Sequence, residues 1–310
     1  MSSDPQPTLT VSPEELEERW GTVSEALAQR VRDTNLQYVR MPQEERDQWL
    51  RKIFDAIVDP HVPAGAHRLE QWEKGWGENL SELTQSSKPE AVIPHYLGKH
   101  PIVRWGGDLA KPVSENFEYL ILTYLVQWMM ETYLADADEI FEFGCGPGYH
   151  LLRARSLFPD KPLHGADWTR ASQDILGKMV EAGIVGNLKG HNFDFTQPDP
   201  ALPITSGSGI YSVAALEQIG DRHEALIQFL IEKKPKVVVH IEPIDEILDE
   251  TRLVDRMSIV YARNRNYLKG YLPRLQELEK EGKLKILDIK RTWTGSLFIE
   301  GHSLIVWKPL

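Results

Sequence analysis

The segment that decides the fold is EIFEFGCGPGY, from Glu139 to Tyr149. A run of strand character ends at Phe143, and Gly144, Gly146 and Gly148 then occupy alternate positions before a helical stretch. Glycine has no side chain and tolerates positive φ, so such a loop lets the backbone approach a bound molecule closely. We therefore expect a nucleotide-cofactor site at the carboxyl end of this strand.

Beyond this loop, β-branched apolar runs alternate with helical segments to the end of the chain. Runs separated by ten or more helical residues predict parallel strands with helical crossovers. The last two runs are about ten residues apart, with Gly295 and Gly301 between them, which suits an antiparallel hairpin. The sequence predicts an α/β fold: a doubly wound, mainly parallel seven-stranded sheet with a C-terminal antiparallel hairpin. The expected strands are 139–143, 162–166, 188–192, 209–213, 236–241, 283–291 and 302–307.

The front of the chain carries helical signals only. The start Ser12-Pro13-Glu14-Glu15 predicts a helix over about 13–32. Further helices are expected after Pro42, over the apolar stripe from Leu69 to Leu83, and from Ser114 to about Tyr133. We therefore expect a helical N-terminal cap and substrate domain at 1–110, followed by the cofactor-binding domain at 111–310.

The helix expected over 69–83 carries Trp72 and Trp76 four residues apart. Aromatic side chains at this spacing lie on one helix face. Such a stripe more often forms helix core than part of a cofactor box, and we interpret both tryptophans as core.

Composition and charge exclude several classes of partner. The chain has 35 Lys+Arg against 46 Asp+Glu, a formal net charge of −11, which disfavours nucleic acid or an anionic membrane surface as the main partner. The start of the chain lacks the features of a signal peptide, and the lone Cys145 allows neither an internal disulfide nor a thiolate metal cluster. We expect a cytoplasmic protein with a small-molecule substrate, no nucleic-acid or membrane partner and no metal. A homodimer through the N-terminal helices is compatible with this organisation.

The segment EFGCGPG resembles the first motif of class I (Rossmann-like) S-adenosylmethionine-dependent methyltransferases, an acid followed by G-x-G-x-G. Dinucleotide dehydrogenases have G-x-G-x-x-G instead, with a helix amino end facing a pyrophosphate. Here the third glycine comes one residue early, and Glu142 would repel a pyrophosphate but suit a sulfonium that carries an ammonium group. The resemblance covers about 114–310 and implies S-adenosylmethionine as the cofactor.

Companion motifs follow in the order that this resemblance implies. Asp167 ends the second strand, where the family has an acid that binds the ribose hydroxyls, and Trp168 follows in a position that often packs on the adenine. Asp194, after the third strand, is similar to the acceptor for the adenine amine, with Phe193 or Phe195 beside the ring. The cofactor-binding residues implied by the resemblance are Glu142, Gly144, Gly146, Gly148, Asp167, Trp168, Asp194 and Phe195.

Three residues are candidates for catalytic acid–base roles. Glu242 ends the fifth strand, where it either orients or deprotonates an acceptor hydroxyl or ammonium, or only caps the next helix. Glu217 and His223 follow the fourth strand, and the positive end of a helix would keep His223 neutral as a base. This stretch resembles the family's L-E-H-I-x-D segment, with Gln218 in the position of the His.

Candidate substrate contacts come from two polar and aromatic segments and from Gln218. Tyr96 and Arg104 lie in the irregular linker, where small-molecule methyltransferases often have a lid segment. Tyr261, Arg263 and Arg265 lie in VYARNRNYL, which suits an acidic or sugar-like acceptor or is simply a solvated helix end.

The sequence therefore predicts a methyltransferase that uses S-adenosylmethionine on a small polar molecule, with O-methylation favoured. The alternatives are an N-methyltransferase of a small amine and a non-catalytic partner subunit that binds S-adenosylmethionine or S-adenosylhomocysteine. A nicotinamide oxidoreductase is the remaining rival, because the third glycine differs from the dinucleotide pattern by only one position.

Overall fold

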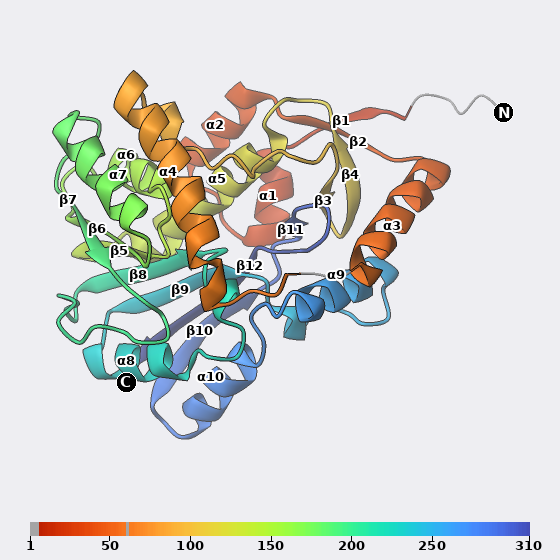
Figure 1. Ribbon diagram of the computed structural model, residues 1–310. Helices are drawn as coiled ribbons and strands as arrows, with labels where there is room; N and C mark the ends of the chain where they lie inside the picture. The colour runs from red at the N-terminus through yellow and green to blue at the C-terminus, as the bar shows by residue number, and fades with distance from the viewer. Residues whose placement is uncertain (1–5, 60–61) are drawn as a thin grey trace.

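The computed structural model describes residues 6–59 and 62–310 and contains two β-sheets (Figure 1). The larger sheet has seven strands in the order β10-β12-β9-β8-β5-β6-β7. Strands β7, β6, β5, β8 and β9 are parallel, and β12 is antiparallel to both β9 and β10. The predicted fold class is confirmed, hairpin included. The strands are β5 (Glu139–Phe143), β6 (Leu163–Asp167), β7 (Leu188–Asn192), β8 (Ser208–Val213), β9 (Val237–Glu242), β10 (Leu284–Lys290) and β12 (Ser303–Pro309).

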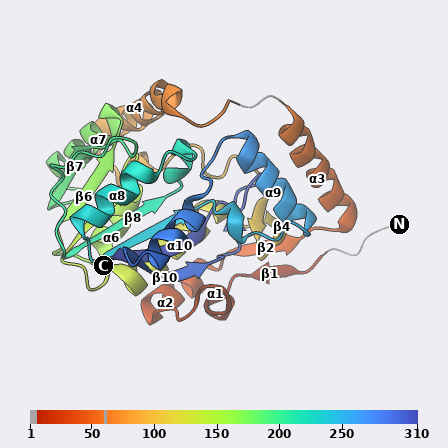
Figure 2. The same cartoon turned by 90° about the horizontal axis from the view of Figure 1, so that it is seen from below.

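Helices cover both faces of this sheet, as Figures 1 and 2 show. The α-helices are α1 (Pro13–Trp20), α2 (Glu25–Thr34), α3 (Gln43–Val58), α4 (Leu69–Ser86), α5 (Phe117–Met129), α6 (Tyr149–Leu157), α7 (Arg170–Glu181), α8 (Glu224–Lys233), α9 (Leu253–Asn264) and α10 (Tyr271–Lys280). Short 3-10 turns are η1 (Ala66–Arg68), η2 (Pro89–Val92), η4 (Leu216–Ile219) and η5 (Asp245–Ile247), and a π-helical turn η3 (Met130–Leu134) continues α5. None of the helices in the described ranges is both long and apolar enough to cross a membrane.

The sheet separates two hydrophobic cores, because successive strand side chains point to opposite faces. In β9, Val237, Val239 and Ile241 join the core beneath α5, α6 and α7, whereas Val238 joins the core beneath α8 and α10. Every residue of β9 is buried, as expected for a parallel strand covered on both faces. The continuous apolar run VVVHI is thus explained by its central position.

Strand β5 lies between β6 and β8. The chain adds β6 and β7 on one side of β5 and then returns to add β8 and β9 on the other side. Phe143 is in register with Ala166 on one side and Ser212 on the other. The carboxyl ends of these three strands therefore meet at one place, the switch point where open α/β sheets bind ligands. The glycine loop begins there.

The front of the chain is not purely helical, which corrects the sequence analysis. A second, antiparallel sheet has the order β1-β2-β4-β3-β11. Its strands have two to five residues and were missed because so short a run shows no clear period-two pattern. They are β1 (Thr8–Thr10), β2 (Gln37–Arg40), β3 (Val103–Trp105), β4 (Asp108–Pro112) and β11 (Thr294–Gly295).

The helix expected over 13–32 is two helices. Gly21 has φ of 99° and ends α1, and Ser24 then caps α2 by accepting a 3.1 Å hydrogen bond from the Leu27 amide. The second helix therefore starts at a new cap and takes its own direction.

The proposed domain boundary at residue 110 falls inside β4. The N-terminal and C-terminal parts also share the small sheet, since Thr294 of β11 is in register with Trp105 of β3. Trp20 on α1 donates a 3.1 Å hydrogen bond to the carbonyl of Thr292. The front helices are thus tied to the segment between β10 and β12.

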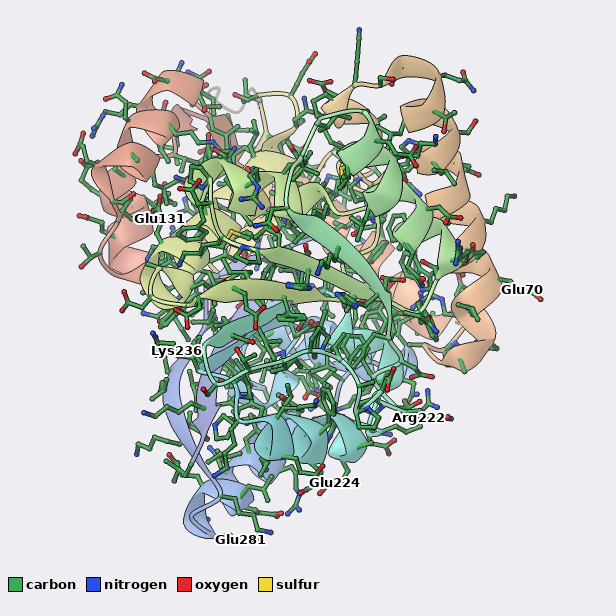
Figure 3. All side chains as sticks on the ribbon, turned by 90° about the vertical axis from the view of Figure 1, so that its left-hand side faces the viewer. Glu70, Glu131, Arg222, Glu224, Lys236 and Glu281 are labelled. Carbon is green, nitrogen blue, oxygen red and sulfur yellow. The ribbon has the colours of Figure 1, made fainter. Side chains whose placement is uncertain are left out.

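Much of the acidic charge lies on the outer surface. Figure 3 shows Glu70, Glu224 and Glu281 at the rim of the molecule, pointing away from its body. All three side chains belong to exposed residues. The buried acids are fewer, and they are therefore the better guide to a binding site.

Candidate active site

A cavity opens at the carboxyl ends of β5, β6 and β8, beside the glycine loop. It encloses about 730 Å³ of empty space, its open mouth included. The lining residues are Trp72, Trp76, Tyr96, Glu142, Gly144, Cys145, Gly146, Pro147, Tyr149, His150, Asp167, Trp168, Phe193, Asp194, Phe195, Val213, Ala214, Ala215, Gln218 and Ile219.

The glycine loop needs its glycines for both conformation and space. Gly144, Gly146 and Gly148 have φ of 70°, 50° and 78°, in the left-handed region that side chains disfavour. A Cβ on Gly144 would lie 2.3 Å from the Cβ of Ala215, and one on Gly146 would lie 2.9 Å from the Trp76 ring. Gly148 lies behind the cavity and starts α6. The loop is thus a cradle that side chains would fill.

Asp167, at the end of β6, holds the glycine loop in place. Its Oδ2 accepts a 2.9 Å hydrogen bond from the Gly146 amide, and its Oδ1 accepts from the amide and hydroxyl of Thr169 at 2.9 and 2.7 Å. Burial raises the pKa of Asp167, and these bonds lower it part of the way back. A lone pair of Oδ2 remains for a ligand hydroxyl.

Glu142 is the second buried acid of the cavity, with 2% of its surface exposed. Its Oε2 accepts a 2.9 Å hydrogen bond from the hydroxyl of Tyr211. Burial raises the pKa of Glu142 well above its ordinary value, and the neighbouring charge of Asp167 acts in the same direction. Two carboxyl groups buried together favour a cationic ligand, which would stabilise their ionised forms.

Trp168, Asp194 and Phe195 also line the cavity, together with Phe193. Asp194 Oδ1 accepts hydrogen bonds from the amide and the hydroxyl of Thr196, both at 2.7 Å. Its Oδ2 is left for another donor. Phe193 packs on Phe143 with ring centroids 4.4 Å apart, so this end of the cavity has flat apolar walls suited to a base.

Trp72, Trp76 and Tyr96 form an aromatic cover over the cavity; Tyr96 was predicted to contact the substrate, whereas sequence reasoning missed the two tryptophans. The two indoles are stacked with centroids 5.4 Å apart, and Tyr96 meets Trp72 edge-on at 6.3 Å. The buried Nε1 of Trp72 has no hydrogen-bond partner among the described residues. The spacing of four residues correctly predicted that both tryptophans lie on one helix face. It did not indicate that this face covers a cavity.

Helix α4 brings this cover over the loop because it packs along α7, and the two lie side by side in Figures 1 and 2. The Glu73 carboxylate accepts hydrogen bonds from the free amides of Arg170 and Ala171 at the start of α7, at 2.8 and 2.9 Å. An acid at a helix amino end is favourable. Glu73 thus fixes the position of the tryptophans on either side of it.

A polar chain reaches the cavity from the start of α4, where the Arg68 guanidinium lies 5.2 Å from the Trp72 ring. Arg68 donates a 2.9 Å hydrogen bond to Gln218 Oε1, and Gln218 Nε2 donates to Glu217 at 2.9 Å. Gln218 lines the cavity, and Glu217 is connected to the cavity through its hydrogen bond with Gln218. Burial, followed by the charge of Glu242, raises the pKa of Glu217 to about 8. Glu217 therefore exchanges its proton near neutral pH.

Glu242 is placed beneath the cavity, where it serves as a cap. The side chain is fully buried; its Oε1 accepts from the Ser212 hydroxyl at 2.7 Å and from the amides of Ala215 and Leu216 at 3.1 and 3.0 Å. Its Oε2 accepts from the Glu217 amide. The capping interpretation thus holds, but for the turn η4 after β8 and not for the helix after β9. We do not retain Glu242 as a group that contacts the acceptor.

His223 and Arg104 lie away from the cavity, and the structure corrects their expected roles. His223 Nε2 donates to the carbonyl of Lys269 at 3.1 Å. Arg104 is 3% exposed and donates to the carbonyls of Val254, Leu297 and Phe298. Its guanidinium therefore ties α9 to the loop before β12. Sequence reasoning missed this because carbonyls from distant segments leave no motif.

None of the residues from Tyr261 to Tyr267 is among the described residues that line the cavity beside the glycine loop. Arg263 is exposed and pairs with Asp245 and Glu250. Tyr261 stacks on Phe298 at 5.1 Å, and Arg265 lies over the Tyr267 ring at 5.7 Å. Arg263 is corrected to a surface residue. Tyr261 and Arg265 stay predictions as substrate contacts, since the charge of Arg265 reaches Glu217 and lowers its pKa.

His150 is a further cavity residue that the sequence did not single out. It follows Tyr149 in the first turn of α6 and is 3% exposed. Its Nε2 is buried with no hydrogen-bond partner among the described residues. Burial lowers the pKa of His150 to about 3, so the imidazole is neutral at physiological pH.

The described residues contain no cluster of three or more His, Cys, Asp or Glu side chains arranged to hold a metal ion. No protein-family model matches the sequence, and no curated protein matches it either.

Solved structures with similar folds were found. One is an O-methyltransferase (NcsB1) from neocarzinostatin biosynthesis in complex with S-adenosylmethionine and 2-hydroxy-5-methyl naphthoic acid (16% identity, TM-score 0.43, 78% of this chain and 70% of that one). A second is magnesium protoporphyrin IX methyltransferase (ChlM) from Synechocystis PCC 6803 with bound SAH (12%, 0.45, 62% and 84%). A third is a SAM-dependent methyltransferase from Aquifex aeolicus (12%, 0.42, 59% and 87%). Likenesses of this size carry no argument about activity, which has to come from the cavity itself.

Proposed function

We propose that the protein is an S-adenosylmethionine-dependent methyltransferase that acts on a small polar molecule. The observation that carries the proposal is the charge of the cavity: Glu142, Asp167 and Asp194 line it, and none of its described lining residues is Lys or Arg. A cavity of this kind suits a cationic ligand. S-adenosylmethionine carries a sulfonium and an ammonium group, and its adenosine offers a ribose and a flat base.

The same cavity disfavours a nicotinamide dinucleotide. A pyrophosphate needs cations or free backbone amides, but the Gly146 amide already donates to Asp167. The sheet also departs from the dinucleotide-binding strand order 3-2-1-4-5-6, because the antiparallel β12 lies between β9 and β10. Both features support the methyltransferase reading over the oxidoreductase.

The residues fit the cofactor in three places. Asp167 would accept from a ribose hydroxyl, Asp194 from the adenine amine, and Glu142 would face the ammonium end. The cradle at Gly146 leaves room for close backbone approach. When bound, S-adenosylmethionine supplies a methyl group on a positively charged sulfur, which is activated for transfer in line to an acceptor.

The protein's own contribution is to align the acceptor and exclude water. Trp72, Trp76 and Tyr96 cover the cavity from α4 and the linker. Gln218 offers an amide at the same mouth and connects it to Glu217. In the ionised form, Glu217 accepts a proton released by an acceptor hydroxyl, either directly or through one water.

O-methylation is the finer part of the proposal, supported by Glu217. A base with a pKa near neutrality assists a hydroxyl more than an amine, which is nucleophilic once neutral. The test is a screen of hydroxyl, carboxyl and amine compounds for S-adenosylhomocysteine release, with wild type and Glu217→Gln in parallel.

Turnover of hydroxyl compounds that falls in Glu217→Gln would support the proposal. Turnover of amines alone would replace O- by N-methylation. Binding of S-adenosylhomocysteine without turnover of any class would favour a non-catalytic partner subunit.

A further inference from the structure

A second cavity lies on the other side of Tyr149 and His150, which line both cavities. It encloses about 690 Å³ of empty space, its mouth included, between η2, α5 and α6. No residue expected to bind the cofactor or acceptor lines it. Its walls consist of Pro89, Glu90, Ile93, Tyr119, Thr123, Tyr149, His150, Leu152, Arg153 and Ser156.

Arg153, in the α6 wall, is a half-buried cation without a partner. Within residues 6–59 and 62–310, its guanidinium makes neither a hydrogen bond nor an ion pair. Burial lowers the pKa of Arg153. A guanidinium has five N–H donors, and those of Arg153 have no acceptor among the described residues, so they are available to a ligand. Arg68 and Arg104, the buried arginines among the described residues, both donate to protein acceptors, whereas Arg153 has no such acceptor.

A second guanidinium reinforces the positive charge behind the same wall. Arg30 on α2 donates to Thr123 Oγ1 at 2.8 Å and to Gln127 Oε1 at 2.9 Å, both neutral acceptors. Burial, followed by the charge of Arg153, lowers the pKa of Arg30 to about 10. The two cations are therefore close enough to repel each other, with no carboxylate paired to either one among the described residues.

Among the described residues, no acid near this cavity is paired directly with Arg153 or Arg30. Glu131 attracts both guanidiniums at a distance, but its oxygens accept hydrogen bonds from Ser24 and Gln127. Figure 3 shows Glu131 beside the N-terminal helices. Glu90 lines the cavity with an exposed side chain, whose charge water screens.

We infer that this second cavity binds an anion, a phosphate or carboxylate group, with Arg153 as its direct charged contact. The hydroxyls of Tyr119 and Ser156 in the same walls supply neutral donors. Arg30 adds long-range attraction from behind Thr123. A planar guanidinium with free donors binds such oxyanions in a bidentate manner. The inference goes beyond the proposed function and does not depend on it, because no cofactor residue takes part.

The test is isothermal titration of the full chain with inorganic phosphate and with phenyl phosphate, at constant ionic strength. We expect saturable binding that weakens about tenfold or more in Arg153→Gln. Arg51→Gln, which removes an exposed arginine on α3, should bind as wild type does. Tighter binding of phenyl phosphate would assign the site to an acidic group on an organic molecule, and equal binding to a free ion.

A second variant distinguishes the loss of a direct contact with phosphate from a change in the stability of the protein. Tyr119→Phe removes a single hydroxyl and should weaken phosphate binding while the thermal unfolding midpoint stays unchanged. Absence of saturable binding to wild type overturns the inference. It is also overturned if Arg153→Gln, or Tyr119→Phe where Arg153→Gln does not fold, binds phosphate as wild type does.

Discussion

The Gly146 amide donates a 2.9 Å hydrogen bond to Asp167 Oδ2, which joins the glycine loop after β5 to the end of β6. The two residues are far apart in sequence and come from two separate motifs. The bond points the Asp167 carboxylate along the loop and into the cavity. The loop and the acid therefore form a single binding surface, and the first two predictions concern its two halves.

Asp167→Asn should weaken S-adenosylhomocysteine binding by about ten- to a hundredfold. It keeps the shape of the side chain but removes the charge that strengthens its hydrogen bonds to the ribose. Isothermal titration measures the change. Asp160→Asn, at an exposed position before β6, is the control and should leave the affinity unchanged. Equal affinity of Asp167→Asn and wild type would remove this residue from the binding surface.

Gly146→Ala should both destabilise the protein and block the cavity. The φ of 50° costs an alanine about 1–2 kcal/mol, and its Cβ would press on the Trp76 ring at 2.9 Å. Chemical denaturation and ligand titration measure the two effects. Gly177→Ala in α7 meets no atom within 4 Å and should instead stabilise the helix by about 0.5–1 kcal/mol. Equal stability and equal ligand affinity of the two variants would contradict the claim that the loop at Gly146 has no room for a side chain.

The rate of methyl transfer to a hydroxyl should rise with pH and level off above about 8. The raised pKa of Glu217, about 8, keeps part of it protonated at neutral pH, and only the carboxylate accepts a proton. The pH dependence of kcat measures this, with Glu217→Gln as the comparison. A pH profile that is the same in Glu217→Gln and wild type would exclude Glu217 as the base.

The ionisation of Glu217 should lower the free energy of unfolding. Because its folded-state pKa is raised, its ionisation disfavours folding, and its contribution to the free energy of unfolding falls as pH rises from about 4.5 to about 8. Glu217→Gln should therefore be more stable relative to wild type at pH 8 than at pH 5. Denaturant titrations at the two pH values measure the difference, and an equal difference at both would contradict the raised pKa.

Arg104→Met should cost about 3 kcal/mol of unfolding free energy, because three buried carbonyls lose a charged donor. Arg263→Met removes only exposed ion pairs and should cost less than about 0.5 kcal/mol. If Arg104→Met changes substrate KM at unchanged stability, the original prediction of a substrate contact was right and the structural assignment wrong.

The sequence predicted the large sheet well because its central strands β5, β6, β8 and β9 are buried almost throughout and form apolar runs between helical segments. The runs around Glu139 and Leu188 gave bounds that match β5 and β7. The small sheet escaped prediction because its strands are short and pair across the whole chain, as Thr294 does with Trp105. Local pattern contains no information about such pairing.

Within the cavity, too, residues at strand ends were predicted from the sequence better than residues on other segments. Asp167, Trp168 and Asp194 follow strand ends, and parallel strands bring their carboxyl ends to one edge, so order along the chain predicted proximity. Gln218 was also predicted, because it follows the fourth strand. Trp76 comes from a front helix, and Arg104 and His223 come from segments that pack elsewhere. Their places depend on tertiary packing, which composition and spacing do not encode.

The central claim, that this cavity binds S-adenosylmethionine, is tested most directly by calorimetric titration of wild type with S-adenosylhomocysteine and, separately, with NAD. We predict saturable one-to-one binding of S-adenosylhomocysteine, which Gly146→Ala weakens, and no saturable heat with NAD. Saturable binding of NAD without binding of S-adenosylhomocysteine, or binding of neither compound, would contradict it.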